Sequence, residues 1–161
     1  MTEQPKAFQD YYPDDYAHCY GCGNLNPSGL HIKSHWDGEM SVCRFTPQPH
    51  QTGGFPDYVY GGLIASLIDC HSAATASAAR LRHEGIRLGQ APLPRHVTAM
   101  LKVDYVKPTP VAELTLESRI LEITPRKVIV ATTLSANGTI RAKGEAVMVL
   151  IPERPSHTEA S

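Results

Sequence analysis

The chain has 161 residues, enough for one domain with a substantial core and too few for two ordinary domains. Its 15 Lys and Arg against 16 Asp and Glu lack the basic excess typical of proteins that bind nucleic acid or acidic membranes. No apolar stretch is long and uncharged enough to span a membrane, and the polar, acidic N-terminus does not resemble a secretory signal. We therefore expect a cytoplasmic protein with a small-molecule partner, no nucleic acid and no membrane.

Four cysteines are a sparse set for a chain of this size, so reduced thiols are expected at Cys19, Cys22, Cys43 and Cys70. Cys19 and Cys22 form one C-x-x-C pair, but a structural zinc site normally needs a second pair of ligands at matching spacing. No second pair stands out. We expect packing or an incidental thiol pair and no metal, while metal binding at Cys19 and Cys22 stays open.

The first residues of the chain show no hydrophobic periodicity, and the residues after them alternate between apolar and polar. Residues 1–28 are rich in Asp, Tyr, Pro, Gly and Asn, which predicts an N-terminal extension and turn cluster ahead of a domain at 29–151. Within that domain, Leu30–Trp36 and Met40–Phe45 read as two strands. Asp37-Gly38 between them predicts a tight hairpin turn.

A long helix is expected next, from Gly62 to about Arg82, after a Gly- and Pro-containing loop. Its residues are small and apolar nearly all round, which is typical of a helix surrounded by protein. Gly61 and Gly62 allow a sharp turn and a close approach to a ligand, and the free N–H groups and positive dipole at a helix start stabilise an oxyanion. Asp69 is a lone carboxylate inside the apolar run, and burying it without compensation is expensive, which favours a functional role.

After the helix, apolar and polar residues alternate, which predicts four more strands at 97–105, 112–123, 128–136 and 140–150. Asn137-Gly138 is the strongest hairpin signal in the chain. Sequential strands with short links form an antiparallel sheet. We expect an α+β fold in which a curved antiparallel sheet of about six strands wraps around one long central helix, followed by a flexible C-terminal tail at 152–161.

Several motifs together resemble one family. They are Gly61-Gly62, Leu67-Ile68-Asp69 and Val103-Asp104-Tyr105-Val106-Lys107-Pro108. In this order they resemble the hotdog-fold acyl-CoA thioesterases of the PaaI/4-hydroxybenzoyl-CoA type, over about residues 29–151. The earlier Cys19-Tyr20-Gly21-Cys22-Gly23, Asn26-Pro27 and Gly29-Leu30 are similar to a bacterial subgroup with a cysteine-bearing N-terminal segment. The resemblance implies hydrolysis of an acyl-CoA thioester to free acid and CoA, with coenzyme A as part of the substrate and no separate cofactor.

The resemblance also implies roles for individual residues. Asp69 would be the general base for water or the nucleophile itself, and both roles stay open. The backbone N–H of Gly62, with that of Leu63 as a further candidate, would hold the thioester oxygen. Thr98 aligns with a Ser or Thr that orients the carboxylate or water in some relatives. Tyr60 stands where relatives commonly carry a histidine, and its phenol can donate the same hydrogen bond but is no cation near pH 7.

The spacing of the two main site residues predicts a dimer. Gly62 and Asp69 are seven residues apart, which is roughly 10 Å along one helix. A base works within about 3 Å of the proton it takes, so one helix cannot readily present both groups to one carbonyl. Since closed two-fold dimers are the commonest assembly, we predict a homodimer with shared sites and leave open a tetramer built as a dimer of dimers. At strand ends, Lys107, Arg126 and Lys127 could meet the phosphates of coenzyme A, although solvated surface charge is the simpler interpretation.

Two other functions stay open. A non-catalytic acyl-CoA or lipid binder would explain why Tyr60 and Gly54 replace a histidine and an asparagine that relatives often carry. An enoyl-CoA hydratase is a weaker alternative, based on a faint likeness of residues 23–31 to the signature of hotdog hydratases. It fails where the chemistry needs it, because Asn24 cannot act as a carboxylate base and His31 is expected to begin a strand. The acyl group, and the choice between CoA and carrier-protein thioesters, are not determined.

Overall fold

A computed structural model describes residues 4–152, so most of the tail predicted at 152–161 lies outside the described residues. Two short 3₁₀ helices come first, η1 (Phe8–Tyr11) and η2 (Asp14–Tyr16). The remaining elements are β1 (Ser34–Asp37), β2 (Met40–Phe45), α1 (Gly61–His83), β3 (His96–Tyr105), β4 (Leu114–Ile123), β5 (Lys127–Ala136) and β6 (Thr139–Leu150). No helix of the described chain is long and apolar enough to cross a membrane.

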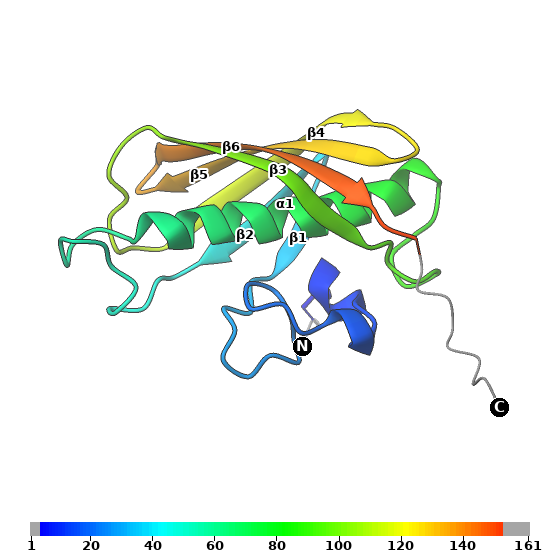
Figure 1. Cartoon of the computed structure of the whole chain (residues 1–161), viewed down its shortest axis with the longest axis horizontal. Helices are drawn as coiled ribbons and strands as arrows, with labels where there is room; N and C mark the ends of the chain where they lie inside the picture. The colour runs from blue at the N-terminus through cyan, green and yellow to red at the C-terminus, as the bar shows by residue number, and fades with distance from the viewer. Residues whose placement is uncertain (1–3, 153–161) are drawn as a thin grey trace.

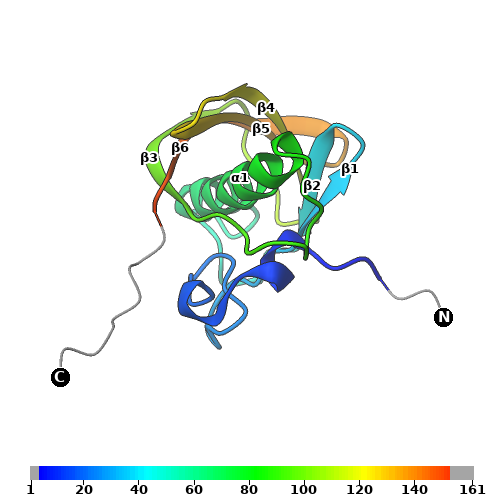
Figure 2. The same ribbon diagram turned by 90° about the vertical axis from the view of Figure 1, so that its right-hand side faces the viewer.

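The six strands form one antiparallel sheet in the order β1-β2-β4-β5-β6-β3. The sheet curves around α1, which crosses its concave face (Figures 1 and 2). This is the predicted hotdog architecture, and it leaves β1 and β3 as the two edge strands. Helix α1 therefore lies between the sheet on one side and the N-terminal segment, which crosses the opposite side.

The predicted hairpins are present, with one shift in position. Asn137 and Gly138 have φ angles of 53° and 72°, as a two-residue turn with both central residues left-handed requires. The first hairpin turns at Gly38, where φ is 62° and where no atom lies within 4 Å of a Cβ at that position. The strand predicted at Leu30–Trp36 was placed too early, because β1 begins at Ser34. His31, expected to begin that strand, has a left-handed φ of 52°, so it cannot continue an extended ladder.

The helix approaches the sheet closely because β6 carries a glycine opposite it. A Cβ on Gly144 would lie 2.4 Å from Cγ2 of Ile68, so only a glycine leaves room for this isoleucine. Ile68 is fully buried and directly precedes Asp69, so this contact also positions the candidate carboxylate. The central core around it contains Leu63, Ile64, Leu67, Ile68, Leu114, Leu116, Leu134 and Ala142.

The N-terminal segment is packed into the fold although its sequence has no periodicity. Phe8 and Gln9 are 1% and 0% exposed. The side chain of Gln9 donates to Ser34 Oγ over 2.9 Å, and the same hydroxyl lies 2.8 Å from Nδ1 of His71 on α1. Ser41 Oγ on β2 lies 3.3 Å from the other ring nitrogen of His71. This buried polar network ties the N-terminal segment, the first hairpin and the helix together.

One side of α1 is less covered than the rest. Residues there are only partly buried, at positions 61, 62, 65, 66, 69, 70 and 73. Positions three, four and seven apart share a face of a helix, so Gly62 and Asp69 both lie along this strip. The strip is where a ligand or another chain can reach the helix.

Candidate active site

Asp69 is held at the middle of α1 by a residue from edge strand β3. The hydroxyl of Thr98 donates to Oδ1 of Asp69 over 2.5 Å. The register of β3 against β6 shifts between Thr98 and Met100, and such bulges re-aim side chains next to active sites. The structure therefore brings together two of the predicted site residues, a half-buried carboxylate and the hydroxyl that orients it.

The start of α1 forms the second part of the candidate site. The Tyr60 carbonyl accepts the N–H of Leu63 over 3.1 Å, so that N–H is already engaged and Gly62 is the better placed of the two predicted oxyanion donors. A Cβ on Gly62 would lie 2.4 Å from Cε1 of Tyr60, so the tyrosine ring lies directly over this glycine. The Tyr60 side chain is 58% exposed, so its phenol is open to a ligand.

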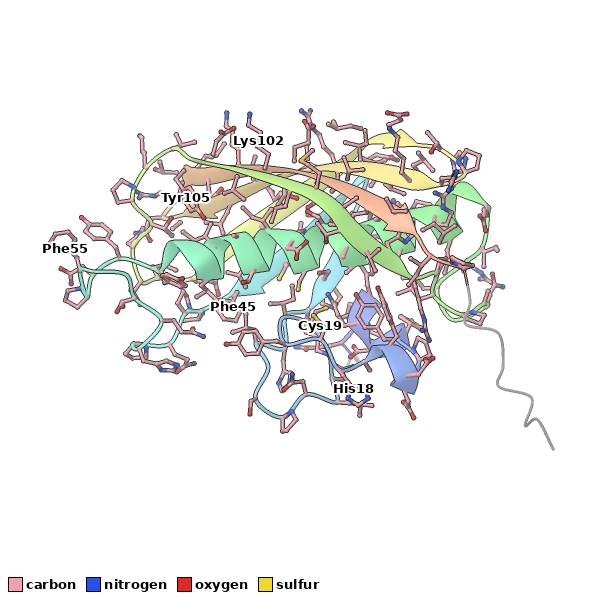
Figure 3. The ribbon with its side chains drawn as sticks, in the orientation of Figure 1. His18, Cys19, Phe45, Phe55, Lys102 and Tyr105 are labelled. Atoms are coloured by element: carbon pink, nitrogen blue, oxygen red, sulfur yellow. The ribbon has the colours of Figure 1, made fainter. Side chains whose placement is uncertain are left out.

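Tyr105, at the end of β3, fixes the position of the helix start. Its hydroxyl donates to the carbonyl of Gly61 over 2.7 Å. Figure 3 shows Tyr105 near the end of α1 from which the loop with Phe55 extends. The sequence motif that contains Tyr105 predicts no role for it, because nothing in a local pattern pairs this strand end with Gly61.

The two parts of the site belong to different pockets of the described chain. Asp69 and Thr98 line a pocket of about 250 Å³. Gly61 lines another, of about 350 Å³, with Tyr105 and Lys107. The single chain thus keeps the carboxylate and the helix start apart.

The three basic residues predicted to contact coenzyme A also lie at two separate places, one near the end of β3 and two near its beginning. Lys107 follows the end of β3 and lines the pocket at the helix start. The carbonyl of Arg126 accepts the N–H of Leu150, which pairs with His96 at the beginning of β3. A strand of ten residues separates these ends, which is roughly 30 Å, so Lys107 and Arg126 cannot meet the same phosphates within one chain. Lys127 lies beside Arg126 at the start of β5.

A cluster of three thiols lies beside Asp69. The sulfurs of Cys19, Cys22 and Cys70 all lie within 4.8 Å of one another, and all three cysteines are free. The pocket that holds Asp69 is lined by the same three residues. Hydrogen bonds from the thiols of Cys22 and Cys70 hold the pKa of Cys19 well below its usual value, and the same contacts raise the pKa values of its two neighbours.

The sequence revealed only part of this cluster. The C-x-x-C pair was visible, but Cys70 is 48 positions beyond Cys22 and forms no second pair in the sequence. Only the crossing of the N-terminal segment over α1 brings it to the pair. Cys43, the fourth cysteine, is buried in the core on β2 and takes no part.

A curved antiparallel sheet around one helix, with a glycine pair at the helix start and a carboxylate on its partly open side, defines a hotdog-fold protein of the thioesterase type. The chain belongs to the thioesterase superfamily, whose family model matches residues 57–141, more than half of its length.

Individual relatives agree with this assignment. A thioesterase superfamily protein from Shewanella loihica PV-4 is 43% identical, with 88% of this chain and all of that chain covered and a TM-score of 0.66. The acyl-coenzyme A thioesterase THEM4 of Rattus norvegicus is 30% identical over 118 residues, 71% of this chain and 45% of the rat protein. The chain thus spans about half the length of that relative. A Streptococcus mutans UA159 protein bound to acetyl-CoA is 14% identical, has a TM-score of 0.60 with 77% and 91% of the two chains covered, and shows the fold alone.

Proposed function

We propose that the protein hydrolyses acyl-CoA thioesters to the free acid and coenzyme A, at a site shared by two copies of the chain. The observation that carries the proposal is the position of Asp69, which is half-buried, oriented by Thr98 and on the same side of α1 as Gly62. As a base, Asp69 takes a proton from water while the hydroxide oxygen bonds to the acyl carbon. The C–S bond then breaks, and the thiolate of coenzyme A leaves and takes up a proton.

The oxyanion that forms in this reaction needs a hydrogen-bond donor, and the backbone N–H of Gly62 is our candidate. Loss of one such donor typically costs about 3–4 kcal/mol of transition-state stabilisation. The Tyr60 phenol, which lies over Gly62, is the candidate for the role that histidine has in many relatives. The relative from rat named as an acyl-coenzyme A thioesterase supports this class of substrate.

The arrangement of β3 supports a two-fold dimer. β3 is an edge strand, and an exposed edge is a template for pairing with another chain. Thr98, near its beginning, contacts Asp69, and Tyr105, its last residue, contacts Gly61. Antiparallel pairing of two β3 strands sets the beginning of one against the end of the other. Asp69 of one copy then approaches the helix start of the second copy, as one active site requires.

The same pairing also unites the basic residues. It brings Lys107 of one copy to the end of the sheet that carries Arg126 and Lys127 in the other copy. We propose these three as contacts for the phosphates of coenzyme A. Apolar side chains exposed near β3 and the helix start are covered in such a dimer: Phe55, Tyr58, Val97, Met100 and Val106.

The test is a panel of acyl-CoA and acyl-carrier-protein thioesters with detection of the released thiol, comparing the wild type with Asp69→Asn. We expect release from at least one CoA thioester and a fall in kcat of about 10²–10⁴-fold in the variant, as for loss of a general base. Asp69→Asn should still bind the substrate, because the amide has nearly the same shape. No release from any member of the panel, or equal release by the variant, would overturn the mechanism.

A non-catalytic binder is the second candidate, because Tyr60 replaces the expected histidine. The substitution Tyr60→Phe distinguishes a hydrolase from a non-catalytic binder. If the phenol donates to the thioester oxygen, its loss should lower kcat about 3- to 10-fold, the worth of one neutral hydrogen bond. Binding of acyl-CoA by the wild type without any thiol release would instead favour the binder.

A further inference from the structure

Three cysteines from two separate parts of the chain meet where the N-terminal segment crosses α1. Cys19 and Cys22 come from the turn after η2, and Cys70 comes from the middle of the helix. The sulfurs of Cys19 and Cys70 are 3.6 Å apart, and all three sulfurs lie within 4.8 Å of one another. Figure 3 shows Cys19 on the part of the N-terminal segment that lies against α1.

The sulfur spacing matches ligands of one tetrahedral metal ion. Zinc binds thiolates at about 2.3 Å with tetrahedral angles, so two of its sulfur ligands lie about 3.8 Å apart. The observed 3.6 Å between Cys19 and Cys70 is close to that value. A disulfide would require about 2.05 Å, so these thiols are not bonded to each other.

The turn that carries the pair is shaped to bring its backbone against the third cysteine. A Cβ on Gly21 would lie 2.2 Å from Sγ of Cys70, so the turn can approach the helix only because this residue is glycine. The backbone N–H groups of Gly21 and Cys22 hydrogen-bond to the Cys19 sulfur, which stabilises a thiolate there. Such outer contacts orient metal ligands and are part of the design of metal sites.

The surroundings of the cluster favour a bound cation. Asp69 lines the same pocket, and no Lys or Arg of the described chain is among its lining residues. Metal binding displaces the thiol protons, and the resulting three thiolates beside a carboxylate, with no Lys or Arg in the pocket, are best balanced by a divalent ion. Soft thiolate ligands select zinc over magnesium or calcium. The open side of the cluster faces this pocket, which has room for a water molecule as fourth ligand.

We propose that Cys19, Cys22 and Cys70 bind one zinc ion, whose fourth coordination position faces the pocket that contains Asp69. The ion fastens the N-terminal segment to α1 one residue from the candidate carboxylate. This site goes beyond thioester hydrolysis, and its occupancy does not depend on whether the protein is a hydrolase.

The test uses the full chain, purified under reducing and anaerobic conditions, stripped of metal with a chelator and titrated with Co²⁺ alone. We expect one Co²⁺ per chain, with a near-ultraviolet thiolate-to-cobalt charge-transfer band and visible bands typical of tetrahedral geometry. One equivalent of Zn²⁺ should abolish the bands. If the reduced wild type binds neither metal, the proposal is overturned. This outcome is measured on the wild type alone, so it does not depend on whether a variant folds.

Two variants, each with a matched control, test which residues form the metal site. Cys70→Ser should weaken Zn²⁺ binding by more than about 100-fold, since it removes a direct ligand, whereas loss of an outer contact costs 10- to 100-fold. Cys43→Ser is its control, because Cys43 is a buried free thiol outside the cluster. Gly21→Ala keeps every thiol but separates the turn from Cys70, and Gly54→Ala is its control, since no atom lies within 4 Å of a Cβ there. A charge-transfer band of undiminished intensity in Cys70→Ser would contradict the assignment.

Discussion

The hydroxyl of Thr98 donates a hydrogen bond to Oδ1 of Asp69 over 2.5 Å and so connects edge strand β3 to the middle of α1. This contact is the side-chain hydrogen bond that orients the carboxylate on α1. The strand that is free to pair with a second chain is therefore also the strand that positions the candidate base.

The Thr98 hydroxyl should matter for turnover more than for binding. Thr98→Val removes a hydrogen bond to a charged group, which is worth about 1.5–3 kcal/mol. We expect kcat to fall roughly ten- to a hundredfold with little change in KM, and Thr98→Ser to restore most of the rate. Steady-state thiol release measures both. An unchanged kcat in Thr98→Val would show that Asp69 needs no orientation by this residue.

The edge of β3 should hold the dimer together. Val97 and Met100 are 43% and 40% exposed there. Replacing both with lysine puts two charged side chains on the edge that pairs, and lysines on an edge strand oppose its pairing with another chain. We expect a folded monomer with little activity. Sedimentation measures the assembly, circular dichroism measures the fold, and thiol release measures the activity. Leu121→Lys, an exposed apolar position on β4, is the control and should stay dimeric. A dimer that survives the double substitution would contradict pairing along β3.

Stability should fall on mild acidification because His71 is buried. Burial lowers its pKa from 6.5 to about 4, so the unfolded chain binds a proton over this range that the folded chain does not. The stabilisation is complete above pH 6.5 and is lost as the pH falls toward 4, by about 3 kcal/mol. Burial also lowers the pKa of His96 to about 4, which adds a second loss of the same sign.

Urea unfolding of the wild type and of His71→Gln between pH 7 and 4 measures this dependence. The variant should show a decline smaller by about 3 kcal/mol, since only His96 then contributes. The exposed His50 serves as control, and His50→Gln should behave as the wild type does. Equal slopes in wild type and His71→Gln would mean that His71 is not held neutral by the fold.

The contact between β6 and α1 should tolerate no side chain at Gly144. A Cβ there lies 2.4 Å from Cγ2 of Ile68, and overpacking of this kind costs about 1–3 kcal/mol. Gly144→Ala should therefore lower the free energy of unfolding by that amount in urea denaturation. Gly54→Ala, at an open position, should change it by far less. If both variants are equally stable, the sheet can move away from the helix without cost.

The sequence by itself determined the elements and the chemistry that each can carry. Hydrophobic alternation, the Asn137-Gly138 turn and the small-residue helix predicted the hotdog architecture, because periodicity and turn chemistry are local properties. Asp69 and the glycine pair were recognisable for the same reason. The position of β1 was predicted too early, since nothing local announced the left-handed backbone at His31.

Only the tertiary structure decided which residues meet. Thr98 was expected near Asp69 from family resemblance, but the contact of Tyr105 with Gly61 and the gathering of Cys70 with Cys19 and Cys22 join segments far apart in the chain. Such contacts depend on how the sheet curves around α1 and where the N-terminal segment crosses it. A local pattern carries no information about these distances, because they arise from packing between elements and not within them.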